Sequence, residues 1–398
     1  PCMDDEEART IGRRLCRIRK ARGKSLRVLA GLAGMDRTTL SRIERGERPL
    51  DKRSEIVALA NALQIAPSEL TDLADSVPGQ GGRDEPVQAV HCALIAAKFG
   101  YPGGLVLSVD VLRDRVAYVQ QARRRGRLAE VATRLPGVIR DLHTSIAAGR
   151  DVAELLSLAT VLHVDVVAHW LHDAGAPELR LQAAALARDV AGEHGEKPDL
   201  AVAAWGTTVA LLTDRMYDLA QAELDAVVLP ATTSSTAGVL GGLAMTRALV
   251  ALVDKRPGDV DAPMEAAAEL AQRFSGADER LGFAIGPAEV GVRRMKLALE
   301  AGEPDRAVSI AEHVRPQEIS FVARKAGYWM EYGQALTRLR GRQDDAVRAL
   351  RTAEQLFPDR VRRNPFVQGA LAELLLRSRR DAVGRELRGM AYRAGLPV

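Results

Sequence analysis

Polar and basic side chains that could contact a nucleic acid are concentrated between Asp36 and Arg45. On a helix over this stretch, the outward positions are held by Arg37, Thr38, Thr39, Ser41, Arg42 and Arg45. All six side chains can donate hydrogen bonds, and an arginine can bond both acceptors on the edge of a guanine. Phosphate oxygens accept from the same donors. The chemistry predicted for this stretch is therefore recognition of DNA.

A helix-turn-helix from Ser25 to Gly46 would position these side chains. The apolar residues that recur at helical spacing are Leu29, Ala30, Ala33, Leu40 and Ile43. Gly34 stands between the two groups, where a tight turn favours a residue that tolerates positive φ. Ser25 and Asp36 each precede a helix and can cap it by accepting from first-turn N–H groups. The second helix would then lie in the major groove of DNA.

The pattern L-A-x-x-A-G-x-x-x-x-T-L-S-R-I-E-R-G, which begins at Leu29, resembles the Cro/C1-type (XRE) helix-turn-helix family. The resemblance covers roughly residues 10–73. It implies a five-helix, lambda-repressor-like DNA-binding domain. It also implies that Arg19 of the first helix pairs with Glu44 at the end of the recognition helix.

The same resemblance implies that Arg37, Thr38 and Arg42 read base edges. One position departs from the family, which often has a phosphate-binding Gln at the start of the second helix. That position is Leu26 here, so phosphate anchoring must rely more on arginines such as Arg27, or on helix N-termini.

Basic residues far outnumber acidic ones between Arg9 and Arg53, as expected of a surface that binds phosphates. We expect the phosphate contacts to come from Thr39, Ser41, Arg45, Arg27 and first-helix arginines such as Arg14.

The remaining sequence predicts an all-α chain of two domains. Residues 1–73 form the DNA-binding domain, with a fourth helix at 54–63 and a fifth at 67–73. Residues 74–86 lack apolar periodicity and are rich in Gly, Pro and acids, so they predict a linker. In residues 87–398, helical patterns alternate with short turns, and no alternating run favours a strand.

The clearest repeat in this second part runs from Trp329 to Pro358 and is similar to a tetratricopeptide (TPR) unit. Weaker copies of the repeat begin at about Tyr217 and Gly302. They predict a TPR-like α-solenoid; an irregular bundle or an unrelated all-α domain are the alternatives. The combination of the helix-turn-helix domain with this second part resembles a group of actinobacterial regulators. It also resembles peptide-sensing regulators of Firmicutes.

The sequence gives little support for a metal, catalytic or cofactor site. Asp165, His169 and His172 would share one face of a helix predicted over 151–174, but the same spacing suits a polar stripe, and we predict no metal. No arrangement of nucleophile and base predicts an enzyme or a catalytic residue, and no motif calls for a cofactor.

Composition is that of a globular protein, with 47% hydrophobic residues and a net charge of +4. The three cysteines share no metal or redox spacing, which fits a reducing cytoplasm. The acidic start is unlike a signal peptide, and no apolar run approaches the length of a membrane span. We therefore expect a cytoplasmic protein with no membrane partner.

The function that these patterns predict is sequence-specific transcription regulation. The expected partner is double-stranded DNA with a palindromic operator, bound by a homodimer. The TPR-like part would mediate dimerisation and sense a peptide or small-molecule effector, whose site the sequence leaves unknown. The alternative is a regulator that acts mainly through protein contacts, as an antitoxin or scaffold, with auxiliary DNA binding.

Overall fold

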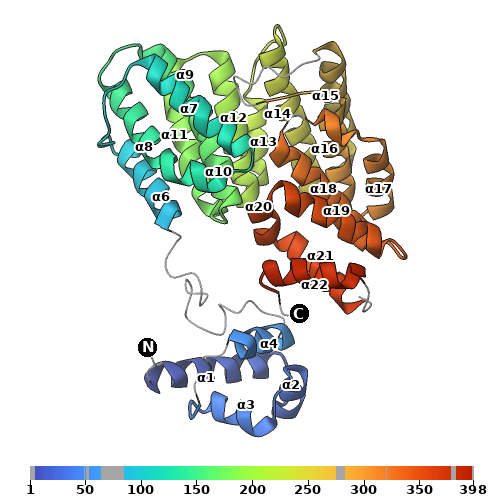
Figure 1. The fold of residues 1–398 in the computed structure, drawn as a ribbon. Coiled ribbons are helices and arrows are strands. Elements are labelled where there is room, and N and C mark those ends of the chain that lie inside the picture. The colour runs from blue at the N-terminus through green and yellow to red at the C-terminus, as the bar shows by residue number, and fades with distance from the viewer. Residues whose placement is uncertain are drawn as a thin grey trace. The chain divides into compact units, whose positions relative to one another are not determined.

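A computed structural model of the chain describes residues 5–48, 50, 53–63, 85–274, 283–319, 321–377 and 382–396. The chain divides into two compact units, residues Pro1–Glu85 and Pro86–Val398. We call them the N-terminal and C-terminal units and describe each by itself (Figure 1). Every regular element among the described residues is helical, so the fold is all-α.

The N-terminal unit is built from α1 (Asp5–Ala21), α2 (Leu26–Leu32), α3 (Arg37–Glu44) and α4 (Arg53–Leu63). Its core consists of Ile11, Leu15, Leu29, Ala30, Leu40, Ile43, Leu50, Leu59, Ala60 and Leu63, each at most 3% exposed. Leu29, Ala30, Leu40 and Ile43, which the periodicity placed on the inner faces of α2 and α3, belong to this core, and Ala33 is partly buried against it. The predicted fifth helix, 67–73, lies outside the described residues.

The C-terminal unit begins with α6 (Glu85–Lys98), α7 (Val109–Arg124), α8 (Leu128–Ala147), α9 (Val152–Val161), α10 (Ala168–Asp173), α11 (Arg180–His194), α12 (Lys197–Thr213) and α13 (Tyr217–Asp225). It continues with α14 (Ser234–Val253), α15 (Asp261–Arg273), α16 (Pro287–Glu300), α17 (Pro304–His313), α18 (Val322–Thr337), α19 (Gln343–Leu356), α20 (Pro358–Arg363), α21 (Pro365–Leu376) and α22 (Ala382–Arg393). Short 3₁₀ turns lie at Pro177–Leu179, Pro257–Asp259 and Pro316–Glu318. The predicted linker 74–86 ends inside α6, and its residues before Glu85 lie outside the described part.

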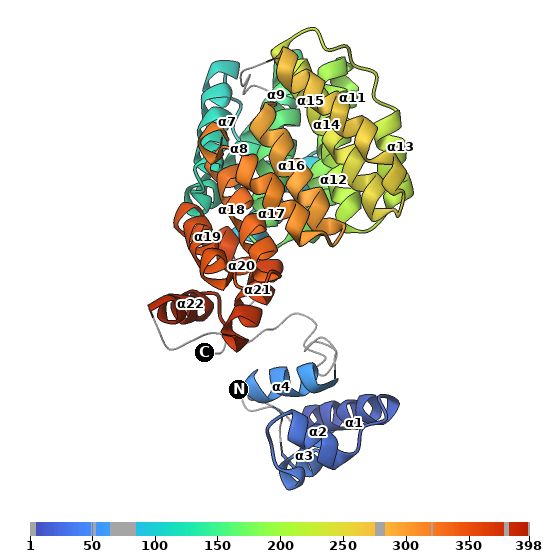
Figure 2. The ribbon, with the colours of Figure 1, turned by 90° about the vertical axis from the view of Figure 1, so that its right-hand side faces the viewer.

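Helices α18 and α19 form the TPR-like pair that the sequence indicates. Gly333 of α18 lies so close to α19 that a Cβ there would be 2.7 Å from the side chain of Leu350. Only glycine allows this approach, which buries Leu336 and Leu350 completely between the two helices. Consecutive helices also pair as α11 with α12, α14 with α15, and α16 with α17 (Figure 2).

The C-terminal unit also packs its late helices against its early ones. The core that contains most of α6 to α11 includes Ala323, Ala326 and Phe357. Arg363 donates from Nη1 to the carbonyl oxygen of Ala174 at 2.7 Å. In an open solenoid, each repeat contacts only its neighbours. The contacts between early and late helices therefore go beyond a simple solenoid, and they enclose a space between α10–α12 and α16–α20.

A π-helical segment, η1 (Leu162–Val167), interrupts the helix predicted over 151–174 and joins α9 to α10. All six of its residues are buried. The i→i+5 hydrogen bonding of a π-helix widens the turn, so the α-helical spacing assumed for Asp165 and His169 does not apply here.

Two helical stretches, Val152–Asp173 and Ser234–Val253, are long and apolar enough to span a membrane by length and composition. The expectation that no run approaches this length was therefore wrong. In the structure, 67% and 72% of these windows are buried inside the C-terminal unit, where they supply its core.

Candidate nucleic-acid interface

Helix α3 begins at a cap that the sequence predicted. The Asp36 carboxylate accepts from the backbone N–H of Thr39 at 2.7 Å and also from its hydroxyl. The hydroxyl and then the backbone N–H lower the pKa of Asp36, which therefore keeps its negative charge at the N-terminus of α3. Ser25 caps α2 in the same way, accepting from the N–H of Val28 at 3.2 Å.

The turn between the helices depends on Gly34, whose φ is +65°. A side chain at this φ would be strained, although nothing within 4 Å obstructs one. The turn and both caps set the angle between α2 and α3.

Helix α3 is held against α1 by an unusually close backbone contact. A Cβ on Gly12 of α1 would lie 2.4 Å from the carbonyl oxygen of Ile43 and 2.8 Å from that of Glu44. Glycine at position 12 therefore lets α1 touch the C-terminal end of α3 directly.

Arg19 and Glu44 form a two-bond ion pair beside this contact. The Nε of Arg19 lies 2.6 Å from Oε1 of Glu44, and its Nη2 lies 2.8 Å from Oε2. Their side chains are only 10% and 7% exposed. The third guanidinium nitrogen donates to the carbonyl oxygen of Lys24 at 2.9 Å. The hydrogen bond to Glu44 raises the pKa of Arg19, so the guanidinium keeps its charge near neutral pH.

The face of α3 opposite this contact presents the predicted base-reading residues to solvent. Arg37, Thr38 and Arg42 are all exposed. Within the part of the chain that the structure describes, none of these three makes a side-chain hydrogen bond or ion pair. Their donors are therefore available to an outside acceptor.

The residues predicted to contact phosphates differ in their surroundings. Arg27 is exposed on α2, whereas Arg14 and Ser41 are half-buried. Arg45 is exposed but forms a 3.1 Å ion pair with Glu47. Thr39 already donates its hydroxyl proton to Asp36, so donation to a phosphate would require that cap bond to break.

The predicted polar stripe of the C-terminal unit lies inside the protein. Asp165 accepts from Arg123 at 2.5 Å, from Arg124 at 3.2 Å and from Gln120 at 2.8 Å. Burial lowers the pKa of His169 well below its usual value and that of His172 to about 3, so both are neutral near pH 7. Among the described residues, no group of three or more His, Cys, Asp or Glu side chains could hold a metal ion.

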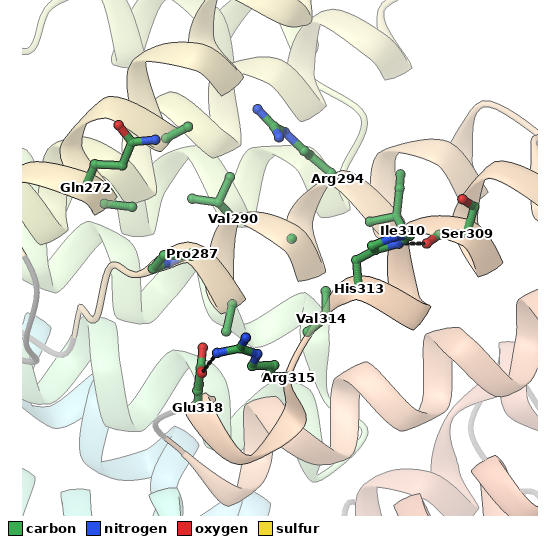
Figure 3. A pocket seen from close by; sticks show the side chains of 14 residues that line it. Gln272, Pro287, Val290, Arg294, Ser309, Ile310, His313, Val314, Arg315 and Glu318 are labelled. Atoms are coloured by element: carbon green, nitrogen blue, oxygen red, sulfur yellow. Dashed lines mark hydrogen bonds and ion pairs between the residues drawn. The ribbon is translucent and has the colours of Figure 1, made fainter.

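Two cavities in the C-terminal unit were not anticipated from the sequence. One, of about 710 Å³, lies between α15, α16 and α17 (Figure 3). Two of its polar groups are paired: Arg315 with Glu318 at 3.1 Å, and His313 Nδ1 with the carbonyl oxygen of Ser309 at 2.7 Å. The other, of about 350 Å³, is lined by charged residues from α7, η1, α10, α11, α16, α18 and α20.

Comparison with known proteins agrees with the geometry of the N-terminal unit. Residues 10–73 match the profile of a family described as a helix-turn-helix domain. No curated protein sequence matches the chain. Two solved structures, a PrgX point mutant and a PrgX/iCF10 complex, are each 10% identical in sequence with a TM-score of 0.28. Each alignment covers 82% of this chain, and 94% and 96% of the respective PrgX chains. The N-terminal unit is a helix-turn-helix domain.

Proposed function

We propose that the chain is a sequence-specific DNA-binding transcription regulator that acts in the cytoplasm as a homodimer on a palindromic operator, and that it is not an enzyme. The observation that carries this proposal is the solvent-exposed donor face of α3, with Arg37, Thr38 and Arg42 unpaired within the described structure. A capped helix whose inner face packs against another helix, as α3 does against α1, is suited to insertion into the major groove. The domain division follows, with residues 1–73 binding DNA and 87–398 mediating dimerisation and effector sensing.

The residues divide by role. Arg37 and Thr38 occupy the first turn of α3 and meet the bases first, while Arg42 reaches farther along the groove. Arg27 projects from α2, where it suits a phosphate. Thr39, Ser41, Arg45 and Arg14 would supply further phosphate contacts, those of Thr39 and Arg45 after release from Asp36 and Glu47.

The test is a binding-site selection with the full chain and three variants. A bidentate Arg–guanine contact discriminates between bases by about 1–3 kcal/mol, whereas a phosphate contact weakens all sequences alike. Arg42→Ala is expected to relax the preference at one base pair per half-site. Arg27→Ala is expected to weaken specific and non-specific binding together. Arg385→Ala, at an exposed position in α22, is the matched control and is expected to change neither.

For a two-fold dimer, the relaxed base pair appears twice, at mirrored positions in half-sites about 34–36 Å apart or a multiple of that. A uniform loss of affinity in Arg42→Ala, with the preferred sequence unchanged, would assign Arg42 to the phosphate. A single unmirrored site would exclude the dimer.

A further inference from the structure

The 350 Å³ cavity of the C-terminal unit contains more basic than acidic side chains. Its basic residues are Arg123, Arg180, Arg293, Lys296, Arg324 and Arg360. Its acidic residues are Asp165, Asp173, Glu289 and Glu331. Buried charge is costly unless it is paired, so this excess requires an explanation.

Two of the carboxylates are already engaged. Asp165 accepts from both Arg123 and Arg124, and Arg124 lies outside the cavity lining. Asp173 lies 3.5 Å from the Nε of Arg360, whose Nη1 donates to the carbonyl oxygen of Ala323 at 3.0 Å. These two acids are therefore engaged by Arg123, Arg124 and Arg360, and Glu289 is the acid that acts most strongly on Arg324. Among the described residues, Arg180, Arg293 and Lys296 are the basic groups of the lining that have no carboxylate oxygen within 4.0 Å.

Arg180 is a buried cation with no ion-pair partner among the described residues. Its residue is only 7% exposed, and its buried Nε has no hydrogen-bond partner among the described residues. Burial lowers the pKa of Arg180 to about 10, although Asp173 acts to raise it. Arg180 is thus a cation that stays charged near neutral pH while its buried Nε lacks an acceptor.

Arg293 and Lys296 lie one turn apart on α16 and face the same cavity. Neither has a carboxylate oxygen within 4.0 Å in the described structure. Burial lowers the pKa of both, and Glu331 is the acid that most opposes this shift. Burial also raises the pKa of Glu331, whose Oε2 has no hydrogen-bond partner in the described part of the protein.

One wall of the cavity is apolar. Trp205 packs edge-on against Phe283 with ring centroids 4.9 Å apart, and it stacks on the neutral ring of His169. Leu212, Met245 and Leu249 extend this wall along α12 and α14. A cavity lined both by unsatisfied cationic groups and by apolar side chains suits a ligand that has an anionic group and an apolar part.

We propose that this cavity binds a small organic carboxylate with an apolar body. The carboxylate accepts hydrogen bonds from Arg180, Arg293 and Lys296, and the body packs against Trp205 and Phe283. The ligand supplies the negative charge that the lining lacks, and charge-assisted bonds in a water-poor cavity give it affinity.

The experiment is a calorimetric titration of the full chain with octanoate. The comparison probes are octanol, which has the same chain without the charge, octyltrimethylammonium, which has the opposite charge, and acetate, which lacks the apolar body. One equivalent of octanoate is expected to bind, with octanol at least about tenfold weaker and no heat from the other two probes. The titration measures ligand binding directly, so its result is independent of whether the chain binds DNA.

Arg293→Met and Lys296→Met keep the apolar stems and remove the charges. Each is expected to weaken octanoate binding about tenfold or more. Arg294→Met is the matched control, because this neighbour on α16 is exposed and lines the other cavity. Without ligand, the first two variants are expected to unfold at the same temperature as the wild type or a higher one, since each removes an unpaired buried cation.

The proposal is overturned if octanoate binds no more tightly than octanol, or if none of the probes binds. It is also overturned if Arg294→Met weakens binding as much as its neighbour does. Lower thermal stability in Arg293→Met and Lys296→Met, with unchanged octanoate affinity, would assign both residues a structural role instead.

Discussion

Replacing Glu44 with alanine is expected to unfold most of the N-terminal unit while leaving the C-terminal unit intact. The substitution removes both short bonds to Arg19, whose side chain is 10% exposed. Among the described residues, the guanidinium then keeps only the Lys24 carbonyl and a long contact to Cys16 Sγ at 3.7 Å. Breaking a buried pair from one side costs about 3–5 kcal/mol, because the remaining charge is stranded.

That cost is a large share of the stability available. A domain the size of residues 10–73 unfolds with a free energy of about 3–10 kcal/mol. The variant is therefore expected to populate the unfolded form of this unit at 25 °C, or to approach its midpoint. Removing both charges, as in Arg19→Met with Glu44→Met, strands neither and is expected to restore part of the loss.

Hydrogen exchange of the full chain, read by mass spectrometry, measures the two units separately. Peptides from α1 to α3 lose protection in Glu44→Ala, and peptides from the C-terminal unit do not. The matched control is Glu47→Ala, because the pair of Glu47 with Arg45 is 49% and 59% exposed and is worth about 0–1 kcal/mol. A loss of protection in Glu44→Ala no larger than in Glu47→Ala would refute the reasoning.

Further predictions concern DNA affinity, helix packing and pH. DNA affinity is expected to fall steeply as the salt concentration rises, and the slope of log affinity against log salt is set by the number of phosphates neutralised. Filter binding at salt concentrations from about 50 to 300 mM measures this slope. An affinity that does not change with salt would contradict the prediction. Gly12→Ala is expected to lower the free energy of unfolding, measured in urea, by about 1–3 kcal/mol, because the new Cβ meets backbone oxygens. The control is Gly31→Ala on α2, where nothing lies within 4 Å, and it is expected to raise the free energy of unfolding by up to about 1 kcal/mol. Equal effects of the two substitutions would contradict the close contact. The prediction about pH concerns the His143–His163 pair, whose Nε2 atoms are 2.8 Å apart. Burial lowers the pKa of His143 to about 4 and that of His163 well below its usual value, so the unfolded chain binds protons below pH 6.5 that the folded chain does not. The C-terminal unit is then expected to lose about 1.4 kcal/mol per pH unit per histidine as pH falls below 6.5, and a constant urea midpoint between pH 7.5 and 5.5 would exclude this.

The helix-turn-helix was predictable because its determinants are local. Caps such as Ser25 and Asp36 act within three residues, and the inner faces of α2 and α3 follow from helical spacing. The pairing of Arg19 with Glu44, 25 residues apart, followed from the family resemblance, since no spacing rule connects the two positions.

The charged cavity was not predictable, because its residues come from separate helices. Arg180 and Arg293 are more than a hundred residues apart and line the same cavity only after the late helices pack against the early ones. In the sequence each is one arginine among many on an amphipathic helix. Asp165 was singled out for its spacing to two histidines, but its partners are arginines of α7.

The π-helical segment at Leu162–Val167 also affects how this chain aligns with its relatives. Such a segment is what one inserted residue produces in an α-helix, since the extra residue widens a single turn and leaves both flanks unchanged. The helix after the segment keeps its place in the core, where the indole N–H of Trp170 in α10 donates to the Leu128 carbonyl oxygen at 3.1 Å. A correct alignment with a relative that has an unbroken α-helix here therefore carries a one-residue gap within 162–167. Without that gap, every core position from Ala168 onward on this helix is matched to a residue on the wrong face.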